Sequence, residues 1–299
     1  MNQIQHLKNN AFVKWLYYGN YFYALCAVAM CMETQCLFGF GSTSIYFYTA
    51  VYCGTVIFYS YPYLQSNSPT NERLQWYAQH KRLVYYSLCL LSLLLLLSVG
   101  IIMYKCYSQL HLLNTKAWVV ISSTIAIALA YYGSKQISLR HIGWLKPFVV
   151  AFVWANVSTL MPVIYYTLLH NMQFKVYGLL GLFWANNFAY IAILCVLFDN
   201  KDVQTDTQQH IKTYIIKYGF AYTKHNIIQP LLLFGVGIVS IIGYTFYSFS
   251  IAYLLWYIPY LVLYILLHTK IETKSLLYYL VVVDGMLLLK ALCIIYYCK

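Results

Sequence analysis

The chain has 299 residues, of which 62% are hydrophobic and 9% are charged, and its mean hydropathy is +0.63. One soluble core cannot bury so much apolar surface, so the composition excludes a soluble globular domain and is typical of a multi-pass membrane protein. The formal net charge of +12 does not indicate nucleic-acid binding, because the Lys and Arg residues are spread over short segments between apolar runs.

Apolar windows of about 20 residues, the length that crosses a bilayer, predict nine membrane spans. In chain order they cover residues 15–37, 43–64, 83–104, 117–132, 147–168, 177–198, 228–247, 249–268 and 276–298. We expect an all-α, polytopic membrane helix bundle that forms one domain over residues 1–299. The nine cysteines lie mostly inside apolar runs without a Cys-x-x-Cys pair, which favours buried small side chains over disulfides or metal ligands.

The distribution of Lys and Arg predicts the direction of these spans. With a cytoplasmic N-terminus, fourteen cationic residues fall on cytoplasmic segments and four on outer segments, while Lys290 lies inside the last span. Cytoplasmic segments carry the excess of positive charge in membrane proteins. We therefore expect an integral protein of the cell inner membrane with a cytoplasmic N-terminus, surrounded by membrane lipid and without a nucleic-acid partner.

Three of the seven acidic residues follow the sixth predicted span, in the stretch "LFDNKDVQTDTQQHIKT" (197–213). If the helix continues by two turns, Asp199, Asp202 and Asp206 lie within roughly 60° of one another on one face. Like charges at this spacing repel, so we expect a cation beside them. Mg²⁺ held by carboxylates and by the phosphate oxygens of a substrate suits this position; a solvated loop whose acids balance nearby lysines is the alternative.

The same stretch resembles the UbiA-like membrane prenyltransferases. Asp202-x-x-x-Asp206 followed by Ile211-Lys212-Thr213 is similar to the second aspartate-rich motif of that family, D-x-x-x-D followed by G-I-K-T, with His210 in place of the glycine. The stretch "LRHIGWLKPFVVAFVWANVSTLMP" (139–162) is similar to the start of the family's fifth helix. Nine spans with an inside N-terminus agree with the family as well, so the resemblance covers nearly the whole chain.

The resemblance implies a prenyltransferase mechanism. Aspartate motifs hold Mg²⁺ on a prenyl diphosphate at a cytoplasmic cavity mouth, and the allylic cation then alkylates a hydrophobic acceptor, typically an aromatic ring. Asp202 and Asp206 take the catalytic positions, and Asp199, Asp202, Asp206 and Glu72 are the expected metal ligands. The expected substrate-binding residues are Lys212, Asn187, Arg140 and Lys146. An interhelical hydrogen bond is the alternative for Asn187, and a role in orienting the chain in the membrane is the alternative for Arg140 and Lys146.

The chain departs from the family at its first motif, N-D-x-x-D-x-x-x-D. The second predicted span carries "YSYPY" (59–63) at that place, and the nearest acid is Glu72. Tyrosine hydroxyls do not replace carboxylates as ligands at neutral pH. Three hypotheses follow: an enzyme with a reduced metal site, a non-catalytic relative that binds an isoprenoid, quinone or other lipid, and a membrane transporter or scaffold.

Three charged residues lie inside predicted spans. We expect Asp284 to pair with another helix or to be protonated, because an ionised carboxylate is costly in a bilayer. Lys290 does not share a helix face with Asp284 and is expected to reach outward to the membrane surface. Glu33 is near the outer end of the first span, far from the expected metal site.

Overall fold

The computed structural model describes residues 10–41, 44–65, 71–133, 138–175, 178–247 and 251–298, and within these ranges the chain is helical without any strand. The longer helical rods are α3 (Tyr21–Leu37), α4 (Ile45–Gln65), α6 (Lys81–Cys106), α7 (Thr115–Tyr132), α8 (Lys146–Ala155) with η3 (Asn156–Leu160) and α9 (Met161–Leu169), α10 (Gly178–Lys201), α13 (Gln229–Phe246), η5 (Ile251–Tyr257) with α14 (Ile258–Leu267), and α16 (Gly285–Tyr297). The shorter elements are α2 (Ala11–Tyr18), α5 (Glu72–Gln79), η1 (Tyr107–Leu112), η2 (Leu139–His141), α11 (Val203–Gln208), α12 (Tyr214–Thr223), η4 (Lys224–Ile228), η6 (Ile271–Thr273), α15 (Leu276–Tyr278) and η7 (Tyr279–Val283).

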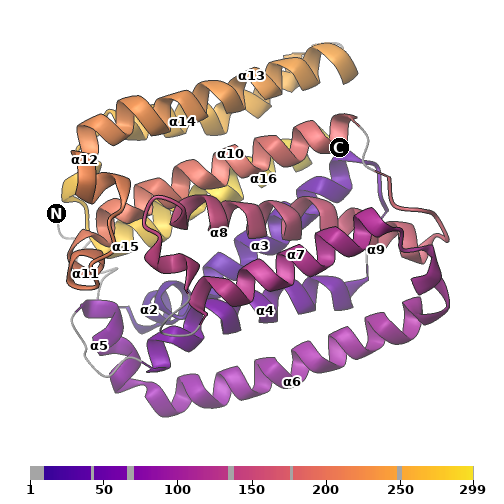
Figure 1. Ribbon diagram of the computed structural model, residues 1–299, viewed down its shortest axis with the longest axis horizontal. Coiled ribbons are helices and arrows are strands. Elements are labelled where there is room, and N and C mark those ends of the chain that lie inside the picture. The colour runs from indigo at the N-terminus through magenta and orange to yellow at the C-terminus, as the bar shows by residue number, and fades with distance from the viewer. Residues whose placement is uncertain are drawn as a thin grey trace.

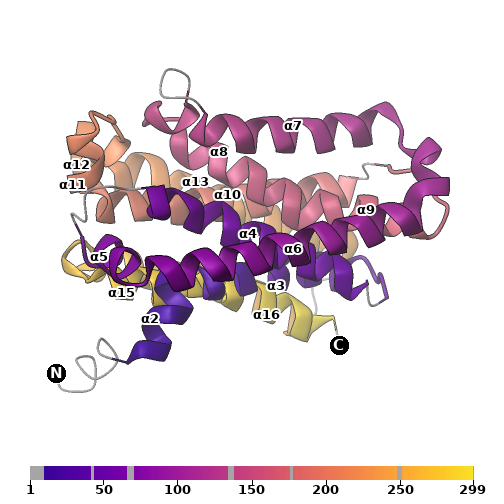
Figure 2. The same cartoon turned by 90° about the horizontal axis from the view of Figure 1, so that it is seen from below.

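The long helices lie side by side, with α6 along one edge of the bundle and α13 and α14 along the opposite edge (Figure 1). Turned by 90°, the bundle shows α7 along a further edge (Figure 2). The short helices α5, α11, α12 and α15 gather at one end in both views. The polar connections that the sequence assigns to the cytoplasm therefore meet at a common end of the bundle.

Six helical segments among the described residues have the length and apolarity to cross a membrane. They are Lys81–Leu112, Thr115–Tyr132, Lys146–Leu169, Gly178–Lys201, Tyr214–Phe246 and Leu276–Tyr297. Three further predicted spans correspond to α3, to the tyrosine-rich α4 and to the η5–α14 rod. Of these, α3 and the η5–α14 rod are apolar helices of no more than 17 residues. The multi-pass helical bundle is thus confirmed, whereas the count of nine spans stays a prediction. Lys8, Lys135 and Lys299, which enter the topology count, lie outside the described residues.

Burial differs sharply between the central and peripheral helices. In α6, Leu90, Leu93, Leu96 and Leu97 are each more than half exposed, whereas most of α10 is buried between α8 and α13. A helix with apolar side chains on its outer surface is stable where the surrounding solvent is lipid. α10 is therefore the central helix, and Asp199 lies near its C-terminal end.

A buried ion pair joins three helices inside the bundle. Lys290 of α16 lies with its Nζ 2.5 Å from Glu33 Oε1 of α3 and 2.5 Å from Asn187 Oδ1 of α10. The lysine is 1% exposed and lies over the ring of Phe183. The expectation that Lys290 reaches the membrane surface is therefore wrong. The reason is that Glu33, 257 residues earlier in the chain, provides a buried counter-ion.

We predict that Lys290→Met destabilises the protein by about 3–5 kcal/mol, because it leaves the buried Glu33 carboxylate without its cation. The double variant Glu33→Gln/Lys290→Met should regain most of this loss, since it buries no unpaired charge. Thermal unfolding of the purified variants in one detergent checks both outcomes. A double variant as unstable as the single one would contradict the ion-pair explanation.

Candidate functional site

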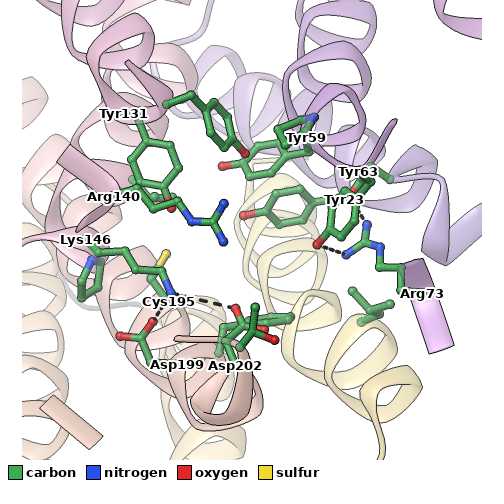
Figure 3. Close-up of a pocket in the computed structure, with 18 of the residues that line it drawn as sticks. Tyr23, Tyr59, Tyr63, Arg73, Tyr131, Arg140, Lys146, Cys195, Asp199 and Asp202 are labelled. Atoms are coloured by element: carbon green, nitrogen blue, oxygen red, sulfur yellow. Dashed lines mark hydrogen bonds and ion pairs between the residues drawn. The ribbon is translucent and has the colours of Figure 1, made fainter. Parts of the chain in front are cut away.

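A cavity of about 280 Å³ opens at the end of the bundle where the short helices gather, between residues of α3, α4, α5, α7, η2, α8, α10, α11 and η7 and of the connections beside them. Figure 3 shows the acidic and basic side chains near one another and the tyrosines around them. The residues that build this cavity fall into an acidic cluster with its lysine, two arginines, a tyrosine wall and one separate carboxylate.

The acidic cluster surrounds Lys146. The lysine Nζ lies 2.9 Å from Asp199 Oδ1, 2.8 Å from Asp206 Oδ2 and 4.0 Å from Asp202 Oδ2. The three carboxylates therefore lie near one another, but the predicted two-turn continuation of the sixth helix, with all three on one face, is wrong. α10 ends at Lys201, the chain bends at Asp202, and the separate helix α11 then begins at Val203.

Lys146 reaches this cluster because the segment before α8 packs closely on the segment after α11. Gly143 lies so near the backbone of Lys212 that an added Cβ would clash with the Lys212 carbonyl. This contact places the start of α8, where Pro147 occupies the first turn, beside Asp206. The lysine side chain is 10% exposed and the Asp199 and Asp206 side chains are 2% and 1% exposed, so the pairs are shielded from water.

Mg²⁺, which the resemblance implies, fits only part of this arrangement. The described residues contain no group of three or more His, Cys, Asp or Glu side chains arranged to hold a metal ion, because Lys146 lies where the carboxylates converge. Asp199 Oδ2 and Asp206 Oδ1 are nevertheless buried without a hydrogen-bond partner, and the Asp202 side chain is 49% exposed and lines the cavity. These carboxylate oxygens suit a Mg²⁺ ion that is bound by one carboxylate and by phosphate oxygens of a ligand.

Two arginines line the cavity and differ in their partners. Arg73 of α5 donates to the Tyr18 carbonyl at 2.9 and 3.0 Å, to Asn20 Oδ1 at 2.5 Å and to the Tyr63 hydroxyl at 3.1 Å. Arg140 makes no hydrogen bond or ion pair with another residue that the structure describes, and its guanidinium projects into the cavity (Figure 3). Arg73 therefore holds the turn between α2 and α3, whereas Arg140 is available to a ligand.

A tyrosine wall faces the charged groups. Tyr59 and Tyr63, both from "YSYPY", lie one helical turn apart on α4 and line the cavity across from Asp199 and Asp202 (Figure 3). Tyr59 accepts a hydrogen bond from Trp154 Nε1 at 2.7 Å, and its ring meets that of Tyr23 edge to face at 4.8 Å. Aromatic rings thus occupy the position at which the resemblance predicts the first carboxylate motif.

Some predicted site residues lie elsewhere. Glu72 accepts a hydrogen bond from the Tyr18 hydroxyl at 3.2 Å and does not line the cavity. Lys212 lines a separate surface groove beside Trp144. Asn187 is held by Lys290 and donates to Thr159 Oγ1 at 2.8 Å, away from the cavity. Of the predicted substrate-binding residues, the structure brings Arg140 and Lys146 to the cavity.

Sequence reasoning did not assign Arg73 or Asp284 to the cavity, and it treated "YSYPY" only as a segment that lacks the expected carboxylates. Tyr59 and Tyr63 carry a usable signal, since their spacing of four residues puts them on one helix face. Asp284 is 7% exposed and lines the cavity. Its carboxylate has no hydrogen-bond or ion-pair partner in the described parts of the chain, so the expected pairing with another helix is not found there.

We predict that Asp202→Asn raises the melting temperature near pH 7. Partial loss of hydration of this half-exposed side chain raises the pKa of Asp202; Lys146 opposes this shift and Asp206 adds to it. The Asp202 carboxyl group therefore binds its proton more tightly in the folded protein than in the unfolded chain. Stability falls as the pH rises from the ordinary aspartate pKa of about 4 to the raised pKa of the folded protein. The gain from Asp202→Asn should vanish below about pH 4.

Melting curves of Asp202→Asn and wild type between pH 3.5 and 8 test this sign, with Glu272→Gln as a matched control because Glu272 is an exposed acid at the same end of the bundle. An Asp202→Asn variant that is less stable than wild type at pH 7 would contradict it.

The cavity thus combines a buried lysine–carboxylate cluster, an arginine open to a ligand, and an aromatic wall. Comparisons of the chain with protein-family models, with curated proteins and with solved structures find no match.

Proposed function

We propose that the chain is a divergent UbiA-like integral membrane prenyltransferase, which binds a prenyl diphosphate in this cavity and transfers the prenyl group to an aromatic or lipid acceptor. The observation that carries the proposal is the placement of Arg140, without a partner among the described residues, and the cavity-facing Asp202 beside a wall of tyrosines. Arg140 can donate hydrogen bonds to a phosphate group, Asp202 can hold the metal ion that accompanies a diphosphate, and aromatic rings suit a long apolar chain with a cationic carbon.

The turn after α11 supports the resemblance on which this proposal draws. His210 adopts φ +56°, a left-handed conformation that favours glycine, and the Ile211 amide donates to the Asp206 carbonyl at 2.8 Å. This pattern closes a helix C-terminus and commonly has glycine at the position of His210. The family motif carries its glycine there, so the local geometry matches what the motif requires.

Charge balance favours a metal ion that arrives with the diphosphate. Three cations, Arg73, Arg140 and Lys146, lie with four carboxylates, those of Asp199, Asp202, Asp206 and Asp284, in and around the cavity. A diphosphate adds several negative charges to a region that already has an excess of one carboxylate. Mg²⁺, when bound, would neutralise that charge and stabilise the departing diphosphate.

The chain's own residues would position the ligand. Arg140 donates hydrogen bonds to the phosphate oxygens. The cavity-facing carboxylate of Asp202 would hold the Mg²⁺ ion that arrives with the diphosphate. Lys146 keeps Asp199 and Asp206 in place. The ring faces of Tyr23, Tyr59 and neighbouring tyrosines attract a cationic carbon electrostatically.

A non-catalytic relative that binds an isoprenoid, quinone or other lipid is the second candidate. Two observations favour it: Lys146 forms ion pairs with two of the three clustered carboxylates, and "YSYPY" supplies no carboxylate on the opposite wall. Such a protein would bind the ligand without releasing diphosphate.

We also propose nine spans, an inner-membrane location and a cytoplasmic cavity mouth. Support comes from the gathering of the lysine- and arginine-bearing connections around α5, α11 and α12 at one end of the bundle, because cytoplasmic segments carry such charge.

Turnover tests the proposal directly. Purified protein in lipid nanodiscs is incubated with Mg²⁺ and labelled prenyl diphosphates of several chain lengths, with a lipid extract as the source of acceptor, and diphosphate release is measured. Release that is lost in Asp202→Ala supports a transferase. Binding without release in wild type supports the non-catalytic candidate, and equal release from both proteins would overturn the enzyme proposal.

We predict that Arg140→Gln weakens Mg²⁺-dependent binding of inorganic diphosphate about 10-fold or more. Hydrogen bonds to charged groups contribute about 1.5–3 kcal/mol, and 1.4 kcal/mol corresponds to a factor of ten. Titration calorimetry measures the affinity, with Lys270→Gln as the control because Lys270 is an exposed lysine at the same end. Binding should also fall when EDTA replaces Mg²⁺; unchanged affinity in Arg140→Gln would show that Arg140 does not hold the anion.

A further inference from the structure

Asp284 is a buried carboxylate that lines the cavity apart from the lysine-centred cluster. It lies where η7 ends and α16 begins, it is 7% exposed, and it lines the cavity together with Leu280, one turn earlier. No residue that the structure describes donates a hydrogen bond to its carboxylate or lies within ion-pair distance of it, so any donor for this group has to come from what fills the cavity.

Burial of a carboxylate without donors is costly, and intramembrane acidic residues are usually functional. The backbone around Asp284 is also irregular, because the Asp284 amide donates to the Tyr279 carbonyl five residues earlier, at 3.1 Å. Such π-helical turns occur frequently at functional sites. Packing does not account for this carboxylate, since a leucine of similar volume would satisfy an apolar wall at lower cost.

The other cavity acids have partners or roles that Asp284 lacks. Asp199 and Asp206 lie within 2.9 Å of Lys146, and Asp202 lies 4.0 Å from it. Arg73, a cation of the same wall, directs its donors to Tyr18, Asn20 and Tyr63. Asp284 is thus the cavity-lining carboxylate, among the described residues, that remains open to a second ligand.

We propose that Asp284 binds the acceptor: its carboxylate accepts a hydrogen bond from an O–H or N–H group of a hydrophobic second substrate, which lies against Tyr23, Cys195 and Phe198 of the cavity wall. The inference rests on the proposed function for its chemistry and names the acceptor class, namely amphiphilic phenols, alcohols or amines. An ether or hydrocarbon of the same shape lacks the donor and would leave the carboxylate unsatisfied.

The transfer step balances with this assignment. The bond between carbon C1 of the prenyl chain and the diphosphate oxygen breaks, and the diphosphate leaves with the electron pair. The acceptor atom forms its bond to C1 and loses its proton to Asp284 in its ionised form, which the O–H or N–H group of the bound acceptor stabilises. The carboxylate later returns this proton to water at the cavity mouth, so Asp284 is unchanged after one turnover.

Three probes that differ only in their head group test the inference: a 4-alkylphenol, a 4-alkylaniline and a 4-alkylanisole with identical alkyl chains. Titration calorimetry in one detergent gives their affinities for wild type, Asp284→Asn and Asp284→Leu. Wild type should prefer the phenol and the aniline over the anisole about tenfold or more, as expected for a hydrogen bond to a charged acceptor. The preference should shrink in Asp284→Asn, which keeps a neutral acceptor, and disappear in Asp284→Leu.

The comparison between variants cancels the different partition of the probes into detergent. Should Asp284→Leu fail to fold, Asp284→Asn still gives the decisive ratio. The same head-group preference in wild type and Asp284→Asn, or no preference in wild type, would overturn the inference.

Mg²⁺-dependent binding of inorganic diphosphate, measured on the same wild-type sample, separates this inference from the proposed function. Diphosphate binding without any head-group preference overturns the role of Asp284 and leaves prenyl diphosphate binding standing. If the head-group preference depends on Asp284 but diphosphate does not bind, the role of Asp284 as a hydrogen-bond acceptor for the ligand is supported. That result counts against the prenyltransferase proposal.

Discussion

The ammonium group of Lys146 lies between the carboxylates of Asp199 and Asp206, and the cavity depends on this contact. It joins the start of α8 to the end of α10 and to α11, three segments that would otherwise repel or separate at their polar ends. Burial makes the charges expensive to leave unpaired, so the arrangement strongly favours one position for the bend at Asp202. That bend turns Asp202 toward the cavity and α11 across its mouth.

A second buried ion pair stabilises the same central helix further along its length. Asn187 and Asp199 are twelve residues apart on α10, or roughly 18 Å at 1.5 Å per residue. One binds Lys290 and the other Lys146. α10 thus packs against its neighbours through apolar side chains and is aligned by two charged contacts, whose loss would be costly in a low-dielectric interior.

The two walls of the cavity are chemically unequal. One wall carries the lysine-centred acids, and the other carries Tyr59 and Tyr63 on α4, with Arg73 beneath Tyr63. A ligand with a charged head and an apolar chain meets a different environment at each end. The Asp284 carboxyl group is a further polar group in the cavity lining. This asymmetry distinguishes the cavity from a symmetric two-metal site.

The sequence by itself determined the membrane character and the helical class, because apolar run length and residue periodicity report directly on these properties. It also predicted that the three aspartates lie together, but on one face of a continued helix, whereas the bend at Asp202 and the start of α11 bring them together in the structure. Only the tertiary structure decided that Lys146 is the cation beside the aspartates and that Lys290 pairs with Glu33 rather than reaching the surface. It also decided which residues share the cavity: Arg140 and Asp284 line it, whereas Glu72, Lys212 and Asn187 do not. Lys146 precedes Asp206 by 60 residues, and Glu33 precedes Lys290 by 257. A periodic pattern identifies the face of one helix, but contacts between distant segments depend on which faces dock against each other, and no local spacing encodes that choice.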